Sequence, residues 1–446
     1  MTAPRPTVYV ETYGCQMNVS DSELMLGTLA AHGYTAVDAP DGADVILVNT
    51  CAIREHAETR VIGRLGELRR HMKRGAVVGV TGCMAQRLGP VLLETVKHVS
   101  MVIGPDGYRA LPELIDGARR GERAVATAFD LEEHYEDFTP RRFDKVKAWI
   151  PVQRGCDYRC TYCIVPSTRG SERSRQLDDV VRETESTVAA GMTEVVLLGQ
   201  TVNSYHDGKH DFADLLRAVG GVPGVRRLRF TSPHPNDFSD RVLDAMAEVS
   251  AVCEHVHLPM QSGSTQVLKR MLRRYTRETY LECVARIRAA MPTVSLTTDI
   301  IVGFPGESDA DFDETLSAVR MVGFAEAFTF KFSLRDGTPA TRMPRSLTVP
   351  DDVASERLSI LVETIRGSAR ASNIRQLGRR CEVLVEKVAR RGGDLLQCRT
   401  RDFKTVLVPG DTTMIGTYMT VELTGTTGST FTGQVVRERP MLPMAG

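Results

Sequence analysis

The most informative stretch of the chain follows a short apolar run and reads Arg154-Gly-Cys156-Asp-Tyr-Arg-Cys160-Thr-Tyr-Cys163. Its cysteines have the spacing C-x3-C-x2-C. Three thiolates on one tight loop can bind three irons of a [4Fe–4S] cluster and leave the fourth iron open. A structural zinc site normally closes with four ligands, so the spacing favours an iron–sulfur cluster. Three coincidental loop cysteines are the alternative, but such tight clustering in a chain with only ten cysteines argues against it.

The overall composition is that of a soluble globular protein. The chain has 446 residues, of which 42% are hydrophobic and 25% charged, and this excludes a disordered chain, a coiled coil and a disulfide-stapled mini-protein. No run approaches the ~18–20 apolar residues of a membrane span, and no signal peptide is recognisable. We therefore expect a cytoplasmic protein without membrane contact, whose cysteines are metal ligands, catalytic groups or buried apolar residues rather than disulfides.

Hydrophobic patterning divides the chain into three domains, and the predicted fold class is α/β. Residues 5–121 alternate strands with helical patterns, which predicts a doubly wound, largely parallel sheet. Residues 122–141 are acidic and polar, as in a linker. Residues 142–373 contain six further strand–helix repeats, which are too few for an eight-stranded barrel and predict a partial (β/α)6 barrel. Residues 376–440 carry four short strand patterns and predict a small antiparallel β-barrel.

A second set of cysteines follows the strands of the first domain. The strands are expected at 7–13, 44–50 and 76–81, and Cys15, Cys51 and Cys83 come directly after them. The carboxyl ends of parallel strands share one edge of a sheet, so these three thiols should converge and could carry a second cluster with an open iron. Free cysteines are also often simply buried, and the residues alone leave the two interpretations about equal.

The first cluster loop, placed after a barrel strand, resembles the radical S-adenosylmethionine (SAM) superfamily. The flanks of the second set resemble the three cysteine motifs of the methylthiotransferase family, and the similarity extends along nearly the whole chain. The Tyr-Gly-Cys-Gln-Met-Asn form is similar to the MiaB-type tRNA branch, whereas the ribosomal-protein branch typically has Cys-Pro-Lys-Asn. The C-terminal barrel resembles the RNA-binding TRAM domain. The motifs are Thr12-Tyr-Gly-Cys-Gln-Met-Asn18, Asn49-Thr-Cys-Ala-Ile-Arg-Glu55 and Thr81-Gly-Cys-Met-Ala-Gln86.

This resemblance implies two [4Fe–4S] clusters and SAM as cofactors. The cluster on Cys156, Cys160 and Cys163 would cleave SAM to a 5′-deoxyadenosyl radical, and the N-terminal cluster would carry the sulfur that another SAM methylates. The implied reaction is methylthiolation of C2 of N6-(dimethylallyl)adenosine at position 37 of tRNA, next to the anticodon. An unactivated aromatic C–H needs such cofactor chemistry, and the base must be splayed out of the anticodon loop. The implied partners are the anticodon stem-loop, an electron donor such as flavodoxin or ferredoxin, and a sulfide source, and we expect a monomer.

Further candidates for the SAM site lie in loops that follow barrel strands. Tyr162 would pack near the adenine by resemblance, and the amides of the 199–203 loop could bind the polar ends of SAM. Thr201 departs from the Asn that is usual in the family, which weakens any role for that position. A plain strand-to-loop turn is the alternative for this loop. The cofactor-binding candidates are Tyr162, Gly199, Gln200, Asn203, Arg173, Gln261 and Ser262.

The net charge of zero conceals three basic windows. Residues 141–175 have nine basic and three acidic residues, residues 269–277 have five basic and no acidic residues, and residues 373–446 have eleven basic and seven acidic residues. The three windows together carry a charge of +15, so the rest of the chain carries −15. A basic run is usually a solvated face, but three beside a cofactor site favour contact with RNA. Arg173 or Arg175 could pair with the SAM carboxylate, contact RNA phosphate, or be solvated.

Two other functions remain open from the sequence. The enzyme could act on threonylcarbamoyladenosine in tRNA or on a ribosomal protein, or the chain could be a non-enzymatic RNA-binding iron–sulfur sensor. The barrel loops argue against a sensor, because a sensor needs no SAM cavity. The remaining cysteines lack ligand-like spacing and are expected to be buried or half-buried: Cys253, Cys283, Cys381 and Cys398.

Overall fold

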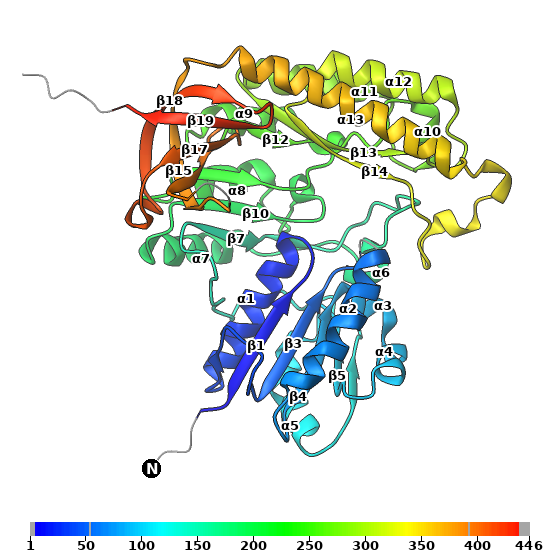
Figure 1. The fold of residues 1–446 in the computed structure, drawn as a ribbon, viewed down its shortest axis with the longest axis vertical. Coiled ribbons are helices and arrows are strands. Elements are labelled where there is room, and N and C mark those ends of the chain that lie inside the picture. Colours follow the sequence, from blue (N-terminus) through cyan, green and yellow to red (C-terminus); the bar gives the residue numbers. More distant parts are fainter. Residues whose placement is uncertain (1–4, 53–54, 391–392, 437–446) are drawn as a thin grey trace, which may run out of the picture.

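The computed structural model describes residues 5–52, 55–390 and 393–436. Ile53 and Arg54 of the second cysteine motif lie outside these ranges, as do residues 391–392 and 437–446 of the C-terminal basic window. Among the described residues, no helix has both the length and the apolar character needed to cross a membrane. Figure 1 shows the N-terminal sheet below a central barrel-like domain, with the C-terminal barrel packed against one end of that domain.

The first domain is a six-stranded parallel sheet with the strand order β2-β1-β3-β4-β5-β6. All residues of the central strands β3 (Val45–Thr50) and β4 (Val77–Gly82) are buried, because helices cover both faces of the sheet. Leu47 belongs to the core under one face, and its neighbours Ile46 and Val48 belong to the core under the other. This alternation confirms the predicted doubly wound fold.

The sheet extends beyond the expected boundary at residue 121. Ala124–Ala126 forms β6, which pairs in parallel with β5, so the first part of the predicted linker belongs to the sheet. Both strands have only three residues, which is too short for a hydrophobic pattern to identify. The other elements of this domain are β1 (Thr7–Thr12), α1 (Gln16–Ala31), β2 (Thr35–Ala36), α2 (Glu55–Leu68), η1 (Arg69–His71), α3 (Cys83–Leu88), α4 (Pro90–Thr95), β5 (Met101–Ile103), η2 (Tyr108–Ala110) and α5 (Leu111–Arg119).

The central domain has the six predicted parallel strands. They form two three-stranded sheets, β11-β10-β7 and β12-β13-β14, and an isolated parallel bridge pairs Leu228 of β11 with Val252, which precedes β12. Helices cover the outer face, and several begin at a side-chain cap, such as Asp211 and Ser308, that satisfies a free backbone N–H of the first turn. The open six-stranded arrangement confirms the predicted partial barrel and leaves its inner face for the site.

Strands and helices alternate through most of the central domain, and two short strands flank the cluster loop. The strands are β7 (Lys147–Pro151), β8 (Gln153–Arg154), β9 (Arg173–Ser174), β10 (Glu194–Leu198), β11 (Arg227–Phe230), β12 (His255–His257), β13 (Ser295–Val302) and β14 (Glu326–Lys331). The α-helices are α6 (Val165–Arg169), α7 (Leu177–Ala189), α8 (Phe212–Gly220), α9 (Asp240–Glu248), α10 (Thr265–Arg270), α11 (Arg277–Ala290), α12 (Asp309–Val322) and α13 (Asp351–Ile374). The short 3-10 helices are η3 (Val202–Ser204), η4 (Pro235–Asp237), η5 (Pro339–Arg342) and η6 (Arg345–Leu347).

The C-terminal domain is a closed barrel with the order β15-β16-β17-β19-β18. Four of its strand pairs are antiparallel, as predicted, but β17 and β19 pair in parallel to close it. The sequence pattern does not predict the strand β16, because polar residues interrupt its short apolar run. The elements are β15 (Arg380–Val388), β16 (Leu395–Thr400), β17 (Thr405–Pro409), η7 (Thr412–Met414), β18 (Tyr418–Thr426) and β19 (Thr430–Val435).

This barrel is fixed to the amino-terminal end of the central strands. The guanidinium of Arg227 is fully buried and donates to the carbonyl oxygens of Arg399 and Glu382. Arg229 donates to the carbonyl oxygens of Thr400 and Arg401. The C-terminal domain therefore closes the end of the central barrel opposite the strand ends that carry the cluster loop.

Candidate cluster-binding site

The N-terminal cysteines lie at the carboxyl edge of the first sheet. Cys15 precedes α1, Cys51 follows β3, and Cys83 begins α3 after β4. The strands β1, β3 and β4 are direct neighbours. The chain order reverses at β1, because β2 pairs with it on one side and β3 on the other. Ligand sites in open α/β sheets lie at such a switch point. The structure thus brings the three loops together, as expected from their positions after the strands.

Asn18 in the first turn of α1 connects the loops of Cys15 and Cys51. Its Nδ2 donates to Asn49 Oδ1 at 3.1 Å and to the Thr50 carbonyl oxygen at 3.2 Å, and its Oδ1 lies 3.3 Å from the Cys15 thiol. Asn18 is completely buried. Because each of its polar atoms has a partner on a cysteine loop, this side chain holds the loops in a common geometry.

Two glycines make the close approach of the loops possible. Gly14 and Gly82 both have positive φ, at +141° and +89°, which side chains disfavour. A Cβ at Gly14 would lie 2.6 Å from the Cβ of Cys51, and one at Gly82 would lie 2.5 Å from the Thr50 carbonyl oxygen. Steric contact therefore explains why glycine directly precedes the cysteine in two of the three motifs.

The N-terminal thiols differ in their electrostatic environment. Hydrogen bonding with the Cys51 side chain lowers the pKa of Cys15 to about 6, against the effect of burial. Burial raises the pKa of Cys83, which the positive charge of Arg169 partly opposes. A thiol of lowered pKa provides the thiolate that iron requires, and metal binding releases the protons of the others.

The cysteines of the C-x3-C-x2-C stretch lie on the loop between β8 and α6: Cys156, Cys160 and Cys163. The backbone N–H of Gly155 donates to Gln200 Oε1 at 2.6 Å, and that of Cys156 donates to the Gly170 carbonyl oxygen. Gly155 has a φ of +77°, and a Cβ there would overlap the carbonyl oxygen of Ser171. The loop therefore depends on glycine at this position.

The thiols of this loop contact two polar side chains from elsewhere in the barrel. Cys156 Sγ lies 3.3 Å from Thr201 Oγ1, and Arg273 Nη1 lies 3.4 Å from Cys160 Sγ. Burial raises the pKa of Cys163 to about 12, so this thiol ionises when a metal displaces its proton. Arg273 belongs to a basic window for which the sequence favours contact with RNA, and no sequence signal indicates its contact with a cysteine.

The donor chemistry of both cysteine sets fits an iron–sulfur cluster. Within the described ranges, no group of three or more His, Cys, Asp or Glu side chains is arranged to hold one ion. In a [4Fe–4S] cluster each thiolate binds a separate iron, so its ligands lie further apart than those of one ion. Both sets supply three cysteines. Such a donor set would leave one iron of a [4Fe–4S] cluster open.

The structure gives most of the predicted SAM-site residues a definite environment. Tyr162 packs edge-on to Phe304 at 6.5 Å between ring centroids. The Oε1 of Gln200 accepts from Gly155, so this amide supports the cluster loop. Asn203 exchanges two hydrogen bonds with the backbone of His234 and ties together the loops after β10 and β11.

The remaining candidates lie on the same rim or are engaged in packing. Gly199 lies against Gln153, whose side-chain oxygen a Cβ would approach to 2.7 Å. Gln261 has a φ of +65° and bridges to Ile300 of β13. The hydroxyl of Ser262 lies 3.3 Å from Thr315 Oγ1. These three positions shape the ends of β10 and β12.

Arg173 and Arg175 do not lie free beside the cluster loop. Arg173 forms a buried bidentate pair with Asp106 of the first domain, at 3.0 and 2.9 Å, and Arg175 pairs with Glu183. The acidic partners come from outside the basic window, where a local count of charges does not detect them. The prediction that Arg173 or Arg175 contacts SAM or RNA, or is solvated, is therefore corrected. Three further arginines of this window also pair with acids of other segments: Arg142, Arg154 and Arg169.

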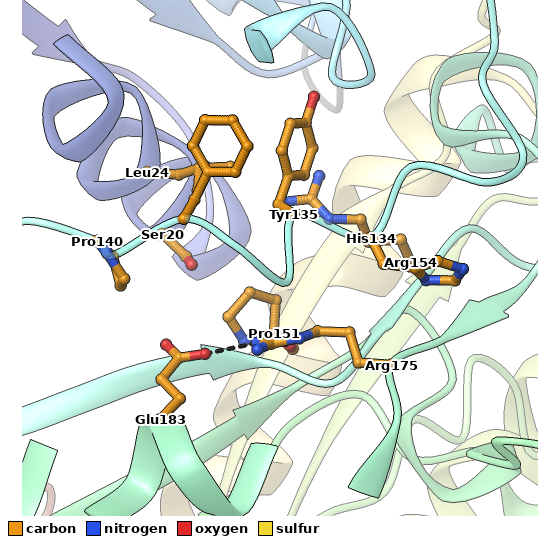
Figure 2. Close-up of a pocket in the computed structure, with 10 residues that line it drawn as sticks. Ser20, Leu24, His134, Tyr135, Pro140, Pro151, Arg154, Arg175 and Glu183 are labelled. Atoms are coloured by element: carbon orange, nitrogen blue, oxygen red, sulfur yellow. Dashed lines mark hydrogen bonds and ion pairs between the residues drawn. The ribbon is translucent and has the colours of Figure 1, made fainter. Parts of the chain in front are cut away.

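Figure 2 shows part of the seam between the first two domains. Ser20 and Leu24 of α1 and Tyr135 of the connecting segment face Arg154 and Arg175 across a cavity of about 20 Å³. A cavity of this size holds about one water, so it cannot be the SAM site. The Arg154 guanidinium lies 4.8 Å from the centroid of the Tyr135 ring, which fixes it in the seam.

The two cysteine sites lie on either side of this seam. Cys83 belongs to an apolar cluster with Ile164, which directly follows Cys163. Cys15 and Met17 belong to another cluster with Leu198 of the barrel. The N-terminal site therefore faces the inner, carboxyl end of the central barrel.

Comparison with known proteins agrees with this division. Residues 7–104 match the uncharacterized protein family UPF0004, and residues 150–319 match the radical SAM superfamily. A tRNA-2-methylthio-N(6)-dimethylallyladenosine synthase of Acetivibrio thermocellus is 41% identical over 98% of this chain and 92% of its own length. A synthase of the same name from Chloroherpeton thalassium is 42% identical over 96% of each chain.

Solved structures share the fold at low sequence identity. The radical SAM methyltransferase TsrM of Kitasatospora setae, with cobalamin and a [4Fe–4S] cluster bound, superposes with a TM-score of 0.58 at 17% identity, over 76% of this chain and 77% of its own. The cobalamin-dependent radical SAM enzyme OxsB gives a TM-score of 0.54 at 14% identity, over 81% and 56% of the two chains. These matches support an N-terminal α/β sheet followed by a partial barrel.

Proposed function

This chain belongs to the family of tRNA-2-methylthio-N(6)-dimethylallyladenosine synthases, and we propose that it methylthiolates C2 of N6-(dimethylallyl)adenosine at position 37 of tRNA. The observation that carries the proposal is the full-length similarity: relatives with this name are 41–43% identical over 96–98% of the chain. The presence of two three-cysteine sites that face one another supports it. The enzyme is a radical SAM tRNA methylthiotransferase.

The cofactors are two [4Fe–4S] clusters and SAM. When bound, they supply the radical and the sulfur atom that insertion at an unactivated C–H requires. We assign Cys156, Cys160 and Cys163 to the cluster that binds SAM, and Cys15, Cys51 and Cys83 to the cluster that carries sulfur. The convergence of each set on one loop or one sheet edge supports this assignment.

The proposed SAM site lies at the carboxyl end of the central strands. Tyr162, Gly199, Gln200 and the 261–262 loop would orient SAM there, and Asn203 would hold the loop that carries Gln200. We leave Arg173 out of this site because Asp106 occupies its guanidinium. The chain's role is to orient SAM and exclude water from it.

The remaining assignments extend this proposal to domains and partners. Residues 5–126 would carry sulfur, residues 142–373 generate the radical, and the barrel at 376–440 bind the anticodon stem-loop. We further propose that a flavodoxin or ferredoxin supplies electrons, that a separate sulfide source supplies sulfur, and that the enzyme acts as a monomer. Since its substrate is tRNA, we expect it in the cytoplasm.

The proposal is tested by the nucleosides of a deletion strain. Mass spectrometry should find N6-(dimethylallyl)adenosine without its 2-methylthio derivative, and the wild-type gene should restore that derivative. Unchanged 2-methylthio-N6-(dimethylallyl)adenosine would reject the proposed substrate. An unmethylthiolated ribosomal protein or threonylcarbamoyladenosine in the same strain would identify the alternative target.

A further inference from the structure

A buried carboxylate of the first domain joins two arginines that flank the cluster loop of the second. Asp21 Oδ1 lies 3.2 Å from Arg154 Nη2, and Asp21 Oδ2 lies 2.7 Å from Arg169 Nη2. Arg154 precedes Cys156 by two residues, and Arg169 follows Cys163 by six. The exposed fractions are 0% for Asp21, 5% for Arg154 and 3% for Arg169. The triad therefore lies in the seam between the two cysteine sites.

The charges of this triad do not balance. Two guanidinium groups face one carboxylate, and the other group that contacts Asp21 is the neutral hydroxyl of Tyr108, 3.4 Å away. Among the residues that the structure describes, the Nη1 atoms of Arg154 and Arg169 are both buried without a hydrogen-bond partner. An uncompensated buried charge with unpaired donors is strongly destabilising. The described part of the chain therefore offers these donors no anion.

The N-terminal cysteine site is the anion that fits. Arg169 ends α6, which packs against α3, the helix that Cys83 begins, and Asp21 of the triad lies on α1, which starts directly after Cys15. Arg169 comes from the central domain, whereas both cysteines come from the first domain. Three thiolates outweigh the positive charge of a [4Fe–4S] core, so a cluster at this site is an anion, and hydrogen bonds to its sulfurs tune its potential.

We propose that Arg169 is a positioning residue of the N-terminal cluster, with its free Nη1 donating to the anionic sulfur of that cluster and with Asp21 and Arg154 fixing its orientation. This proposal rests on the second cluster of the proposed function. It makes the N-terminal cluster easier to reduce, because reduction adds negative charge beside a fixed cation. It also ties the position of each cluster to the other, since the same triad holds both ends of the radical SAM loop.

The test measures the N-terminal cluster alone in the full-length protein. A C156A/C160A/C163A parent should retain this cluster after anaerobic reconstitution, and its reduction potential is measured by titration followed by electron paramagnetic resonance. In this parent, Arg169→Gln should shift the potential to a more negative value, and Arg169→Lys should shift it less. Arg142→Gln is the matched control: Arg142 pairs with Glu23, on the same helix as Asp21, across the same seam, and its loss should leave the potential unchanged.

A second variant gives a shift of opposite sign. Asp21→Asn removes the carboxylate and leaves both guanidinium groups, so it should move the potential to a more positive value, which a loss of packing does not predict. If Arg169→Gln fails to fold, the sign of the potential shift in Asp21→Asn tests the proposal in its place. A parental potential in Arg169→Gln, or a negative or absent shift in Asp21→Asn, overturns the role of Arg169. A parent that binds no cluster would instead reject the second cluster of the proposed function.

Discussion

Replacement of Arg227 by methionine should release the C-terminal barrel from the central domain. Arg227 lies on β11 with a fully buried side chain. It donates to the Arg399 carbonyl oxygen at 2.8 Å and to Glu382 through the carbonyl oxygen at 3.3 Å and the carboxylate at 3.1 Å. Methionine fills much of the same volume but offers no donor, so these acceptors lose their partner in the interior.

The structure sets the size of the effect. Removal of one partner from a buried ion pair costs about 3–5 kcal/mol. Arg227 Nη1 lies 3.8 Å from the buried carboxylate of Glu194, and Arg229 Nε lies 3.3 Å from it. In the variant this carboxylate keeps Arg229, so we expect a loss near the lower end, about 3 kcal/mol. That free energy raises the population of undocked barrel roughly 100-fold.

Limited proteolysis measures this population, because cleavage of a transiently open state follows its equilibrium fraction. The junction to probe is the segment between α13 and β15. The matched control is Arg226→Met: Arg226 also pairs with Glu382, but half of its side chain is exposed, and exposed pairs contribute about 0–1 kcal/mol. Equal cleavage rates for the Arg226 and Arg227 variants, both close to that of the wild type, would refute the role of buried Arg227 in holding the C-terminal barrel.

Three further predictions concern the cysteine loops and the contact between the C-terminal barrel and the central domain. Gly155→Ala should distort the radical SAM loop and halve the iron content after reconstitution, because its Cβ would overlap the Ser171 carbonyl oxygen; unchanged iron would contradict this. Asn18→Ala should cost about 1–3 kcal/mol through unpaired buried groups and lose iron from the N-terminal site, as measured in the C156A/C160A/C163A parent. Burial alone would raise the pKa of Glu386, but the positive charges of Arg399 and Lys147 outweigh it and lower this pKa to about 2. The ionised Glu386 therefore stabilises the fold above the unfolded pKa of about 4.3, and this stabilisation is lost as the pH falls toward 2. Urea unfolding between pH 6 and pH 3 should show a weaker pH dependence in Glu386→Gln, and an identical dependence would contradict the assignment.

The positions of the cysteines could be predicted because they depend on local rules. Cys15, Cys51 and Cys83 each follow a β-branched strand, and parallel strands bring their carboxyl ends to one edge whatever the distance in sequence. The spacing of Cys156, Cys160 and Cys163 needs only one loop. Both arguments use the strand pattern and nothing from the rest of the fold.

The charged interior could not be predicted in the same way. Asp21 meets Arg154 and Arg169 across 133 and 148 residues of sequence, and no local pattern connects them. A count of charges in the 141–175 window therefore suggests a basic surface, whereas the structure buries several of these arginines against acids of other segments. The alternation of Arg227 and Arg229 in a buried strand is the one available sign that charges lie inside the barrel.

The short strands escape prediction for a different reason. The strands β5 and β6 have three residues each, and their positions are determined by pairing with a neighbour rather than by a pattern of their own. The site itself depends little on them, because the cysteine loops follow the three longer strands.

The most direct test of the account is the product that the purified enzyme forms. The reconstituted protein is incubated with SAM, a reductant, sulfide and tRNA that contains N6-(dimethylallyl)adenosine, and the nucleosides are identified by mass spectrometry. The wild type should yield 2-methylthio-N6-(dimethylallyl)adenosine, and a C15A/C51A/C83A variant should yield 5′-deoxyadenosine without the methylthiolated nucleoside. Methylthiolation by that variant, or its absence with the wild type holding both clusters, would contradict the account.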